Sequence, residues 1–290
     1  MLAVPITAAM EGLRLRPWWA ATDSPPLGVV IQECLAAKER ANRRPLYLTE
    51  LRRSLTKFMV GREGADPRLI SPADLEAFFL ANDYSMGTRL TMISRLSTLF
   101  GFAQKRGYIE HNPALRLERP VIEQKAPMIL SPAEASTLLE YAGYIGMLAY
   151  VVIGMFVGVR PVETERLSWA DIDAGRGIIR VDAAASKVRR RRIIQVEPNV
   201  TAWLQSLDQS KPITPPQKRA KLRSLAMLLK LDYLPHDCLR HTAASYLMAL
   251  HKDSGKVATH LGNSPGVLLA RYYQLVSPDH CAAFWNILPP

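Results

Sequence analysis

Leu239-Arg240-His241-Thr242-Ala243-Ala244-Ser245 is the stretch of sequence that most constrains the fold, and Leu261-Gly262-Asn263-Ser264-Pro265 follows it. Arg271-Tyr272-Tyr273 closes the segment. The spacing of apolar residues around these stretches predicts helices from about Val200 to the end of the chain. An arginine, an amide and a tyrosine in this order supply a permanent cation, a hydrogen-bond donor and a hydroxyl nucleophile.

Two further patterns precede this segment. Gly158-Val159-Arg160-Pro161-Val162-Glu163 ends a long apolar run, and Trp169-Ala170-Asp171-Ile172-Asp173 comes next, which we interpret as turn chemistry. Residues 177–181 and 192–196 are rich in β-branched residues, which predicts two short strands. The basic stretch Lys187-Val188-Arg189-Arg190-Arg191-Arg192 lies between these two strands.

Together the four patterns resemble the tyrosine recombinase (phage integrase) family in their order and spacing. The motif resemblance covers residues 123–290, whereas residues 27–120 resemble only the helical architecture of the family's core-binding domain. The resemblance implies a C-shaped clamp around double-stranded DNA. It also implies strand exchange through a covalent phosphotyrosine, with no metal and no other cofactor.

The resemblance assigns a role to each matching residue. Arg160 and Arg240 are expected to clamp the non-bridging oxygens of the phosphate, because arginine binds such oxygens in pairs and stays charged. Tyr272 is expected to attack phosphorus and form the covalent intermediate. Lys187 is expected to protonate the leaving 5′ oxygen as a general acid.

This sequence departs from the family pattern at two catalytic positions. Asp237 stands where the family usually has histidine, and His236 comes one residue too early, so either could fill this position. Asn263 stands where histidine or tryptophan is usual, and its amide can still donate a hydrogen bond to a phosphate oxygen. Glu163 and His241 are expected to support the site without reacting.

Arginines outside these motifs are expected to contact the DNA backbone. A run of like charges is more often a solvated face or a non-specific phosphate patch than a catalytic group. The residues that we expect to bind DNA in this way are Arg43, Arg44, Arg89, Arg189, Arg190, Arg191 and Arg192.

Composition agrees with a DNA-binding protein of one or two domains. The chain has 290 residues and a formal net charge of +11, which favours an anionic partner. The three cysteines, Cys34, Cys238 and Cys281, are scattered, which argues against a disulfide framework and against a zinc site. No signal peptide is recognised, and we expect a cytoplasmic protein.

The fold class that we predict is mainly α with a small β-sheet. Ser71-Pro72 and Ser131-Pro132 each combine a capping residue with proline at the first helical position, so helices are expected to begin there. The predicted divisions are an N-terminal arm (1–26), a helical SAM-like core-binding domain (27–120), a linker (121–127), and a catalytic domain with a C-terminal tail helix (128–290).

Two apolar segments allow more than one interpretation. The uncharged run from Tyr141 to Val159 has nearly the length of a membrane span, but its glycines and flanks favour a buried core helix, and we expect no membrane contact. The tail from Leu275 to Pro290 is expected to dock on a neighbouring protomer in a tetramer on DNA, as family tails do. The alternative is that the tail packs on its own domain.

Two other functions share these sequence features. A catalytically decayed integrase that binds DNA as an accessory or regulatory protein would explain the changes at Asp237 and Asn263. A type IB topoisomerase would use the same chemistry. Retention of Tyr272 favours catalysis, because DNA binding alone has no use for this hydroxyl.

Overall fold

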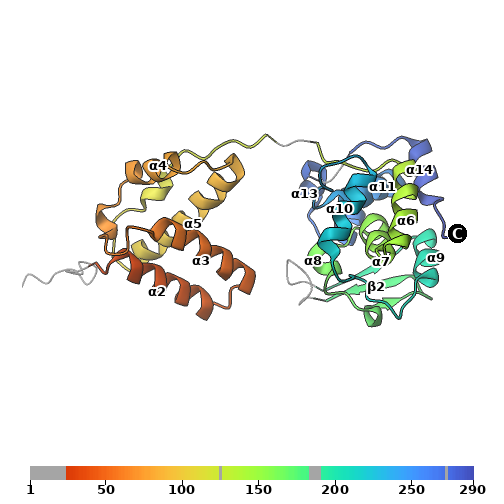
Figure 1. Cartoon of the computed structure of the whole chain (residues 1–290), viewed down its shortest axis with the longest axis horizontal. Helices are drawn as coiled ribbons and strands as arrows, with labels where there is room; N and C mark the ends of the chain where they lie inside the picture. Colours follow the sequence, from red (N-terminus) through yellow and green to blue (C-terminus); the bar gives the residue numbers. More distant parts are fainter. Residues whose placement is uncertain (1–23, 124–125, 183–190, 272–273) are drawn as a thin grey trace, which may run out of the picture. The chain divides into compact units, whose positions relative to one another are not determined.

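The chain divides into two compact units, residues 1–124 and residues 125–290 (Figure 1). The computed structural model describes residues 24–123, 126–182, 191–271 and 274–290. Within these ranges, no helix is long and apolar enough to cross a membrane.

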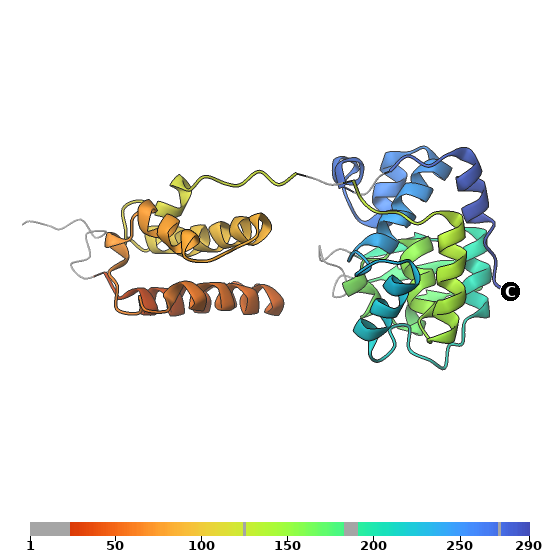
Figure 2. The ribbon, with the colours of Figure 1, turned by 45° about the horizontal axis from the view of Figure 1, so that its top comes forward.

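In the part of unit 1 that the structure describes, residues 24–123, four α-helices form two layers. Figure 2 shows α2 and α3 in one layer and α4 with α5 in the other. Ser71 caps α4 through a reciprocal capping box with Asp74, as the sequence predicts. Phe58, Phe78 and Phe100 meet edge to face in the buried centre of the unit. The helices are α2 (Leu27–Arg40), α3 (Pro45–Met59), α4 (Pro72–Leu80) and α5 (Met86–Lys105), with short 3-10 turns η1 (Pro67–Leu69) and η2 (Pro113–Arg116).

Unit 2 is helical around a small sheet. Figure 1 shows the strands along one side of this unit and α14 on the side away from them, with α6 and α7 between. The elements before the sheet are α6 (Pro132–Tyr144), α7 (Leu148–Val152), the π-helix η3 (Ile153–Val157), α8 (Pro161–Thr164) and the 3-10 turn η4 (Trp169–Asp171). Those after the sheet are α9 (Pro198–Ser206), α10 (Lys218–Leu228), α11 (Cys238–His251), α12 (Ser254–Leu261), α13 (Pro265–Arg271) and α14 (Pro278–Trp285).

The sheet is antiparallel with strand order β1-β2-β3. Its strands are β1 (Ile172–Asp173), β2 (Ile178–Val181) and β3 (Arg192–Gln195), and Ile179 pairs with Ile194 across the last two. The two predicted strands are therefore confirmed, but β1 was not expected, because Asp-Ile-Asp was interpreted as a turn alone. The predicted fold class, mainly helical with a small sheet, is confirmed.

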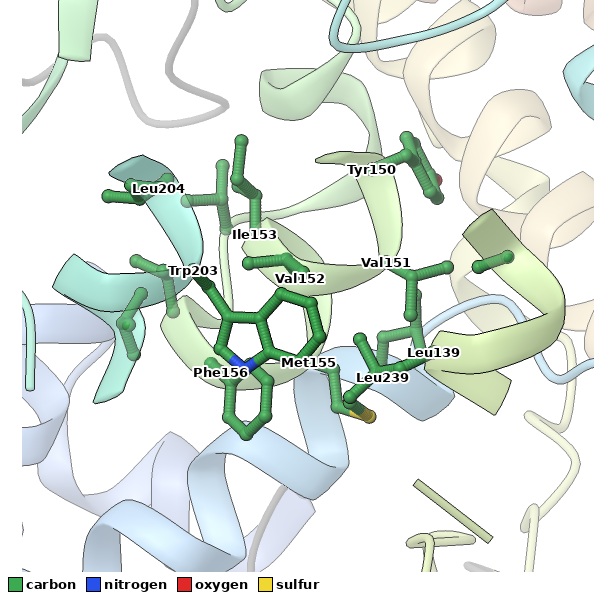
Figure 3. Close-up of a cluster of buried hydrophobic side chains, with 14 of the residues drawn as sticks. Leu139, Tyr150, Val151, Val152, Ile153, Met155, Phe156, Trp203, Leu204 and Leu239 are labelled. Carbon is green, nitrogen blue, oxygen red and sulfur yellow. The ribbon is translucent and has the colours of Figure 1, made fainter. Parts of the chain in front are cut away.

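The apolar run is mostly buried from Met147 to Val159, whereas Tyr144 is 80% exposed, and the prediction of one continuous helix is wrong. Helix α6 ends at Tyr144, and Gly146 has a φ of 66°, which turns the chain before α7 begins. Helix α7 then widens into the π-helix η3. Figure 3 shows the side chains of α7 and η3 packed between Trp203 of α9 and Leu239 of α11.

The C-terminal tail packs against its own unit. The ring of Phe284 is fully buried and stacks on the ring of Tyr246, with a distance of 3.8 Å between the ring centroids. Trp285 Nε1 donates to the carbonyl of Tyr246, and Trp203 Nε1 donates to the carbonyl of Ile287. These contacts correspond to the alternative interpretation, in which the tail folds back onto its own domain.

Replacing Phe284 with alanine should therefore destabilise unit 2 strongly. Removing a fully buried aromatic ring from a packed core costs about 3 to 5 kcal/mol of unfolding free energy. Denaturant unfolding of the full chain measures this loss. Leu288→Ala is the control, because Leu288 is exposed and its loss should change stability by less than about 0.5 kcal/mol. Equal unfolding midpoints for the two variants would contradict the packing described above.

Candidate active site

Arg160 is positioned by a turn at Gly158, two residues before it. Gly158 follows the π-helix η3 with a φ of 71°, a conformation that residues with a side chain rarely adopt. A Cβ atom at this position would lie 2.5 Å from Leu261 Cδ2 and 2.9 Å from Ala243 Cβ. Glycine is thus required both for the turn and for the close contact with α11 and α12. Pro161 then starts α8, so that Arg160 occupies the N-cap position.

Arg160 and Asn263 lie in direct contact, although they are far apart in sequence. Arg160 Nη2 donates to Asn263 Oδ1 at 2.5 Å and to the carbonyl of Gly262 at 2.9 Å. Arg160 Nη1 donates to Glu163 Oε1 at 3.0 Å. The side chain is 11% exposed, so the guanidinium is held in a fixed orientation at the edge of the unit.

Arg240 holds together the two segments that carry these residues. Its side chain is almost completely buried in α11. Nη1 donates to the carbonyl of Gly158 at 2.5 Å and Nη2 to the carbonyl of Leu261 at 2.8 Å. Each of these carbonyls comes two residues before a candidate phosphate ligand, Arg160 in one case and Asn263 in the other. The guanidinium of Arg240 therefore fixes the spacing between the two candidates.

Asn263 keeps one donor available. Because its Oδ1 accepts from Arg160, the amide orientation is set and Nδ2 is the remaining donor. This Nδ2 atom is buried and has no hydrogen-bond partner among the residues that the structure describes. A buried donor without a partner is costly, which makes this atom a candidate for binding a phosphate oxygen.

Glu163 is the buried anion of the site. Its carboxylate accepts from Arg160 and from Arg192, whose Nη2 lies 2.6 Å from Oε2. Burial raises the pKa of the Glu163 carboxyl. The hydrogen bond and charge of Arg192, together with the charge of Arg160, outweigh this effect and lower the pKa to about 2. Glu163 is therefore ionised at neutral pH.

The lowered pKa of Glu163 predicts a dependence of stability on pH. The folded-state pKa of about 2 lies below the usual 4.5, so the ionised carboxylate stabilises the fold above about pH 4.5. This contribution, about 3 kcal/mol, is lost as the pH falls towards 2. Glu163→Gln should flatten the curve of unfolding free energy against pH between 5 and 2, measured by denaturant titration. Glu165→Gln is the control, since Glu165 is partly exposed; equal slopes for the two variants would contradict this assignment.

His236 and Asp237 lie together at the start of α11. Asp237 takes the N-cap position, and its Oδ1 lies 3.3 Å from Nδ1 of the exposed His236. A cavity of about 270 Å³ beside them is lined by His236 and Arg240, among others. His241 is half-buried one residue after Arg240, and burial lowers the pKa of its imidazole. The two residues that could replace the expected histidine thus lie next to each other at the start of α11.

The arginines predicted to contact DNA differ from one another in exposure and in their ion pairs. Arg43 is exposed, and Arg44 takes the N-cap position of α3. Arg89 lies on α5 with Nη2 2.6 Å from Glu76 Oε2, so part of its charge is already balanced. Arg191 is 62% exposed and close to Asp182. Arg192 is instead turned inward on Glu163. Four predicted site residues lie outside the described residues: Lys187, Arg189, Arg190 and Tyr272.

Ser245 makes a contact with Gln274 that the sequence did not predict. Its side chain is fully buried on α11, and its Oγ accepts a hydrogen bond from the backbone N–H of Gln274 at 2.9 Å. Gln274 comes two residues after Tyr272, so this bond fixes the chain close to the predicted nucleophile. The only indication in the sequence was that Ser245 ends the Leu239–Ser245 motif.

A metal ion bound by protein side chains needs several ligands around one point. Among the residues whose placement is described, no group of three histidine, cysteine, aspartate or glutamate side chains is arranged to hold one.

Comparison with known proteins identifies the relatives of this chain. No family model matches it. It is 25% identical over 218 residues to tyrosine recombinase XerC of Azotobacter vinelandii, covering 69% of this chain and 73% of the relative. It is 23% identical over 249 residues to tyrosine recombinase XerD of Vibrio vulnificus, covering 75% of this chain and 81% of the relative. The chain is thus similar to curated tyrosine recombinases over about two thirds or more of its length. The resemblance that its motifs indicate is thereby confirmed.

Solved structures of integrases share its fold. A lambda integrase dimer bound to a COC′ core site matches with a TM-score of 0.68 at 14% identity, covering 96% of this chain and 85% of that chain. The Tn1549 transposon integrase in complex with a circular intermediate DNA matches with a TM-score of 0.65 at 18% identity, covering 90% and 98%. At such identities the likeness shows the fold alone.

Proposed function

We propose that this chain is a site-specific recombinase that cleaves and rejoins DNA strands through a covalent 3′-phosphotyrosine. The observation that carries the proposal is the contact between Arg160 and Asn263, held in place by Arg240. Two arginines and an unpartnered amide donor form a cationic group suited to one phosphate. Such a preorganised set of donors stabilises the charge that develops on a phosphate under attack.

The chemistry that we propose needs no group beyond the chain and the DNA. The hydroxyl oxygen of Tyr272 attacks phosphorus and its proton passes to solvent. The bond from phosphorus to the 5′ oxygen breaks, and Lys187 supplies a proton to that oxygen. Arg160, Arg240 and Asn263 bind the non-bridging oxygens. The 5′ hydroxyl of a second strand later attacks the phosphotyrosine and releases the tyrosine, so that no bond energy is lost.

The pairing of His236 with Asp237 suggests how the missing histidine is replaced. His236 lines the same cavity as Arg240, whereas Asp237 Oδ1 lies 3.3 Å from Nδ1 of the imidazole. We assign the phosphate contact to His236 and an orienting role to Asp237, because a carboxylate next to the phosphate would repel it. Exposed Arg43 and Arg191 are assigned to the DNA backbone. We further propose that the active form is a tetramer on DNA, in the cytoplasm.

Covalent trapping tests the proposed function. Labelled DNA spanning the flanks of the protein's own gene is incubated with the purified chain in the presence of a chelator. A detergent-resistant adduct whose DNA-linked peptide contains Tyr272 is the expected result. Salt-sensitive binding with no adduct on any flanking fragment would instead support a DNA-binding accessory protein. Relaxation of supercoiled DNA at many sites, without exchange of strands between two duplexes, would support a topoisomerase.

A further inference from the structure

Arg192 is bound inside the protein by all three nitrogens of its guanidinium. Nε donates to the carbonyl of His260 at 3.3 Å, Nη1 to Glu163 Oε1 at 3.2 Å, and Nη2 to Glu163 Oε2 at 2.6 Å. The side chain is 10% exposed. Arg191, its neighbour in the basic run, is 62% exposed. Arg192 is therefore held away from solvent, and its contacts differ from those expected of a DNA-binding arginine.

A glycine completes this arrangement. A Cβ atom at Gly262 would lie 3.2 Å from Nη1 and 3.3 Å from Cζ of Arg192, so the backbone packs directly on the guanidinium. The carbonyl of the same Gly262 accepts from Arg160. Gly262 thus contacts both arginines, while Glu163 accepts from both of them on the other side.

The net charge of the buried group formed by Arg160, Arg192 and Glu163 follows from its ion pairs. Arg160 and Arg192 contribute two positive charges, and the ionised Glu163 contributes one negative charge. The buried group therefore keeps a net charge of about +1. Without Arg192, the carboxylate would neutralise Arg160 alone, and the group would offer a phosphate no net charge.

We propose that Arg192 is a positioning residue that shares Glu163, so that the charge of Arg160 stays available to the phosphate of the DNA. This inference rests on the proposed function. It assigns to Arg192 a role in the rate of cleavage and no direct contact with DNA. The role follows from the ion pairs and from the burial of the side chain.

Charge compensation tests the inference. Arg192→Met should lower the rate of adduct formation at saturating DNA by about 100-fold, as expected when charge stabilisation of a transition state is lost. The DNA affinity and its dependence on salt should stay unchanged within about twofold, since no phosphate contact is removed. The double variant Arg192→Met/Glu163→Gln restores a net charge of +1. It should therefore react at least about tenfold faster than Arg192→Met.

Two further variants keep the result interpretable. If Arg192→Met does not fold, Arg192→Lys and Arg192→Gln replace it: the lysine retains the charge, and only the glutamine should show the slow cleavage. Arg176→Met is the control for expression and rate. Arg176 is exposed in the turn between β1 and β2, and no role in the site is assigned to it.

The following results would overturn the inference. They are a double variant no faster than Arg192→Met, equal rates for the lysine and glutamine variants, and a loss of DNA affinity together with a weaker dependence on salt. If the unchanged chain gives no adduct, the proposed function fails and this inference fails with it. An active unchanged chain with a fully active Arg192→Met overturns the inference alone.

Discussion

Tyr272→Phe should bind DNA as tightly as the unchanged chain and form no covalent adduct. Phenylalanine keeps the ring and loses only the hydroxyl that attacks phosphorus, so the covalent step has no nucleophile. Loss of a nucleophile lowers the rate by more than about 10,000-fold in enzymes that depend on one. Affinity is measured by titration of labelled DNA, and adduct formation by denaturing electrophoresis under single-turnover conditions.

Tyr273→Phe is the matched control. It removes the same hydroxyl one residue later in the sequence, at a position to which the motif spacing assigns no role. We expect the Tyr273→Phe protein to retain its adduct within about twofold of the unchanged rate. Loss of the adduct in Tyr273→Phe with retention in Tyr272→Phe would move the nucleophile to Tyr273. If both variants retain the adduct, neither tyrosine is the nucleophile.

Local chemistry explains what the sequence predicted well. The helix starts at Ser71 and Ser131 were predicted because a capping box depends on residues within one turn. The contact between Glu163 and Arg160 rests on the same kind of proximity, since the two are three residues apart. Pairs of this kind form as soon as the local backbone does. The sequence alone therefore specified them.

Longer-range packing explains what the sequence predicted poorly. The break at Gly146 interrupts an apolar run whose composition fits one helix equally well. β1 has only two residues and exists because β2 lies beside it. The position of Arg192 could have been inferred, because side chains alternate along a strand: Ile194 is buried and Ile193 is exposed. Arg192 shares the buried face with Ile194, which the run of four arginines obscured.

The role of Arg240 shows why a motif match gives residues but not their geometry. The family resemblance implies a phosphate clamp, yet the two hydrogen bonds of Arg240 reach the carbonyls of Gly158 and Leu261, 82 and 21 residues away in sequence. No periodicity in the sequence predicts these bonds. They place Arg240 where it fixes the distance between Arg160 and Asn263, in addition to the phosphate contact that we propose.

Arg240→Met should therefore abolish cleavage while weakening the fold only moderately. Two effects on stability oppose each other: the substitution leaves two buried carbonyls without these donors, which costs about 1 to 3 kcal/mol each, and it removes a buried charge, which is favourable. We expect a net loss of about 2 kcal/mol in unfolding free energy. Cleavage should fall by at least about 1,000-fold, because a phosphate ligand and the placement of Arg160 and Asn263 are lost together.

Arg240→Lys separates the charge of this side chain from its geometry. A lysine keeps the positive charge, but its single nitrogen cannot reproduce the two diverging bonds to Gly158 and Leu261. We expect adduct formation about 100-fold below the unchanged rate, between those of the unchanged chain and Arg240→Met. Denaturant unfolding of both variants reports whether the fold is kept. If Arg240→Lys cleaves at the unchanged rate, charge alone is sufficient, and the two carbonyl bonds play no part in aligning the site.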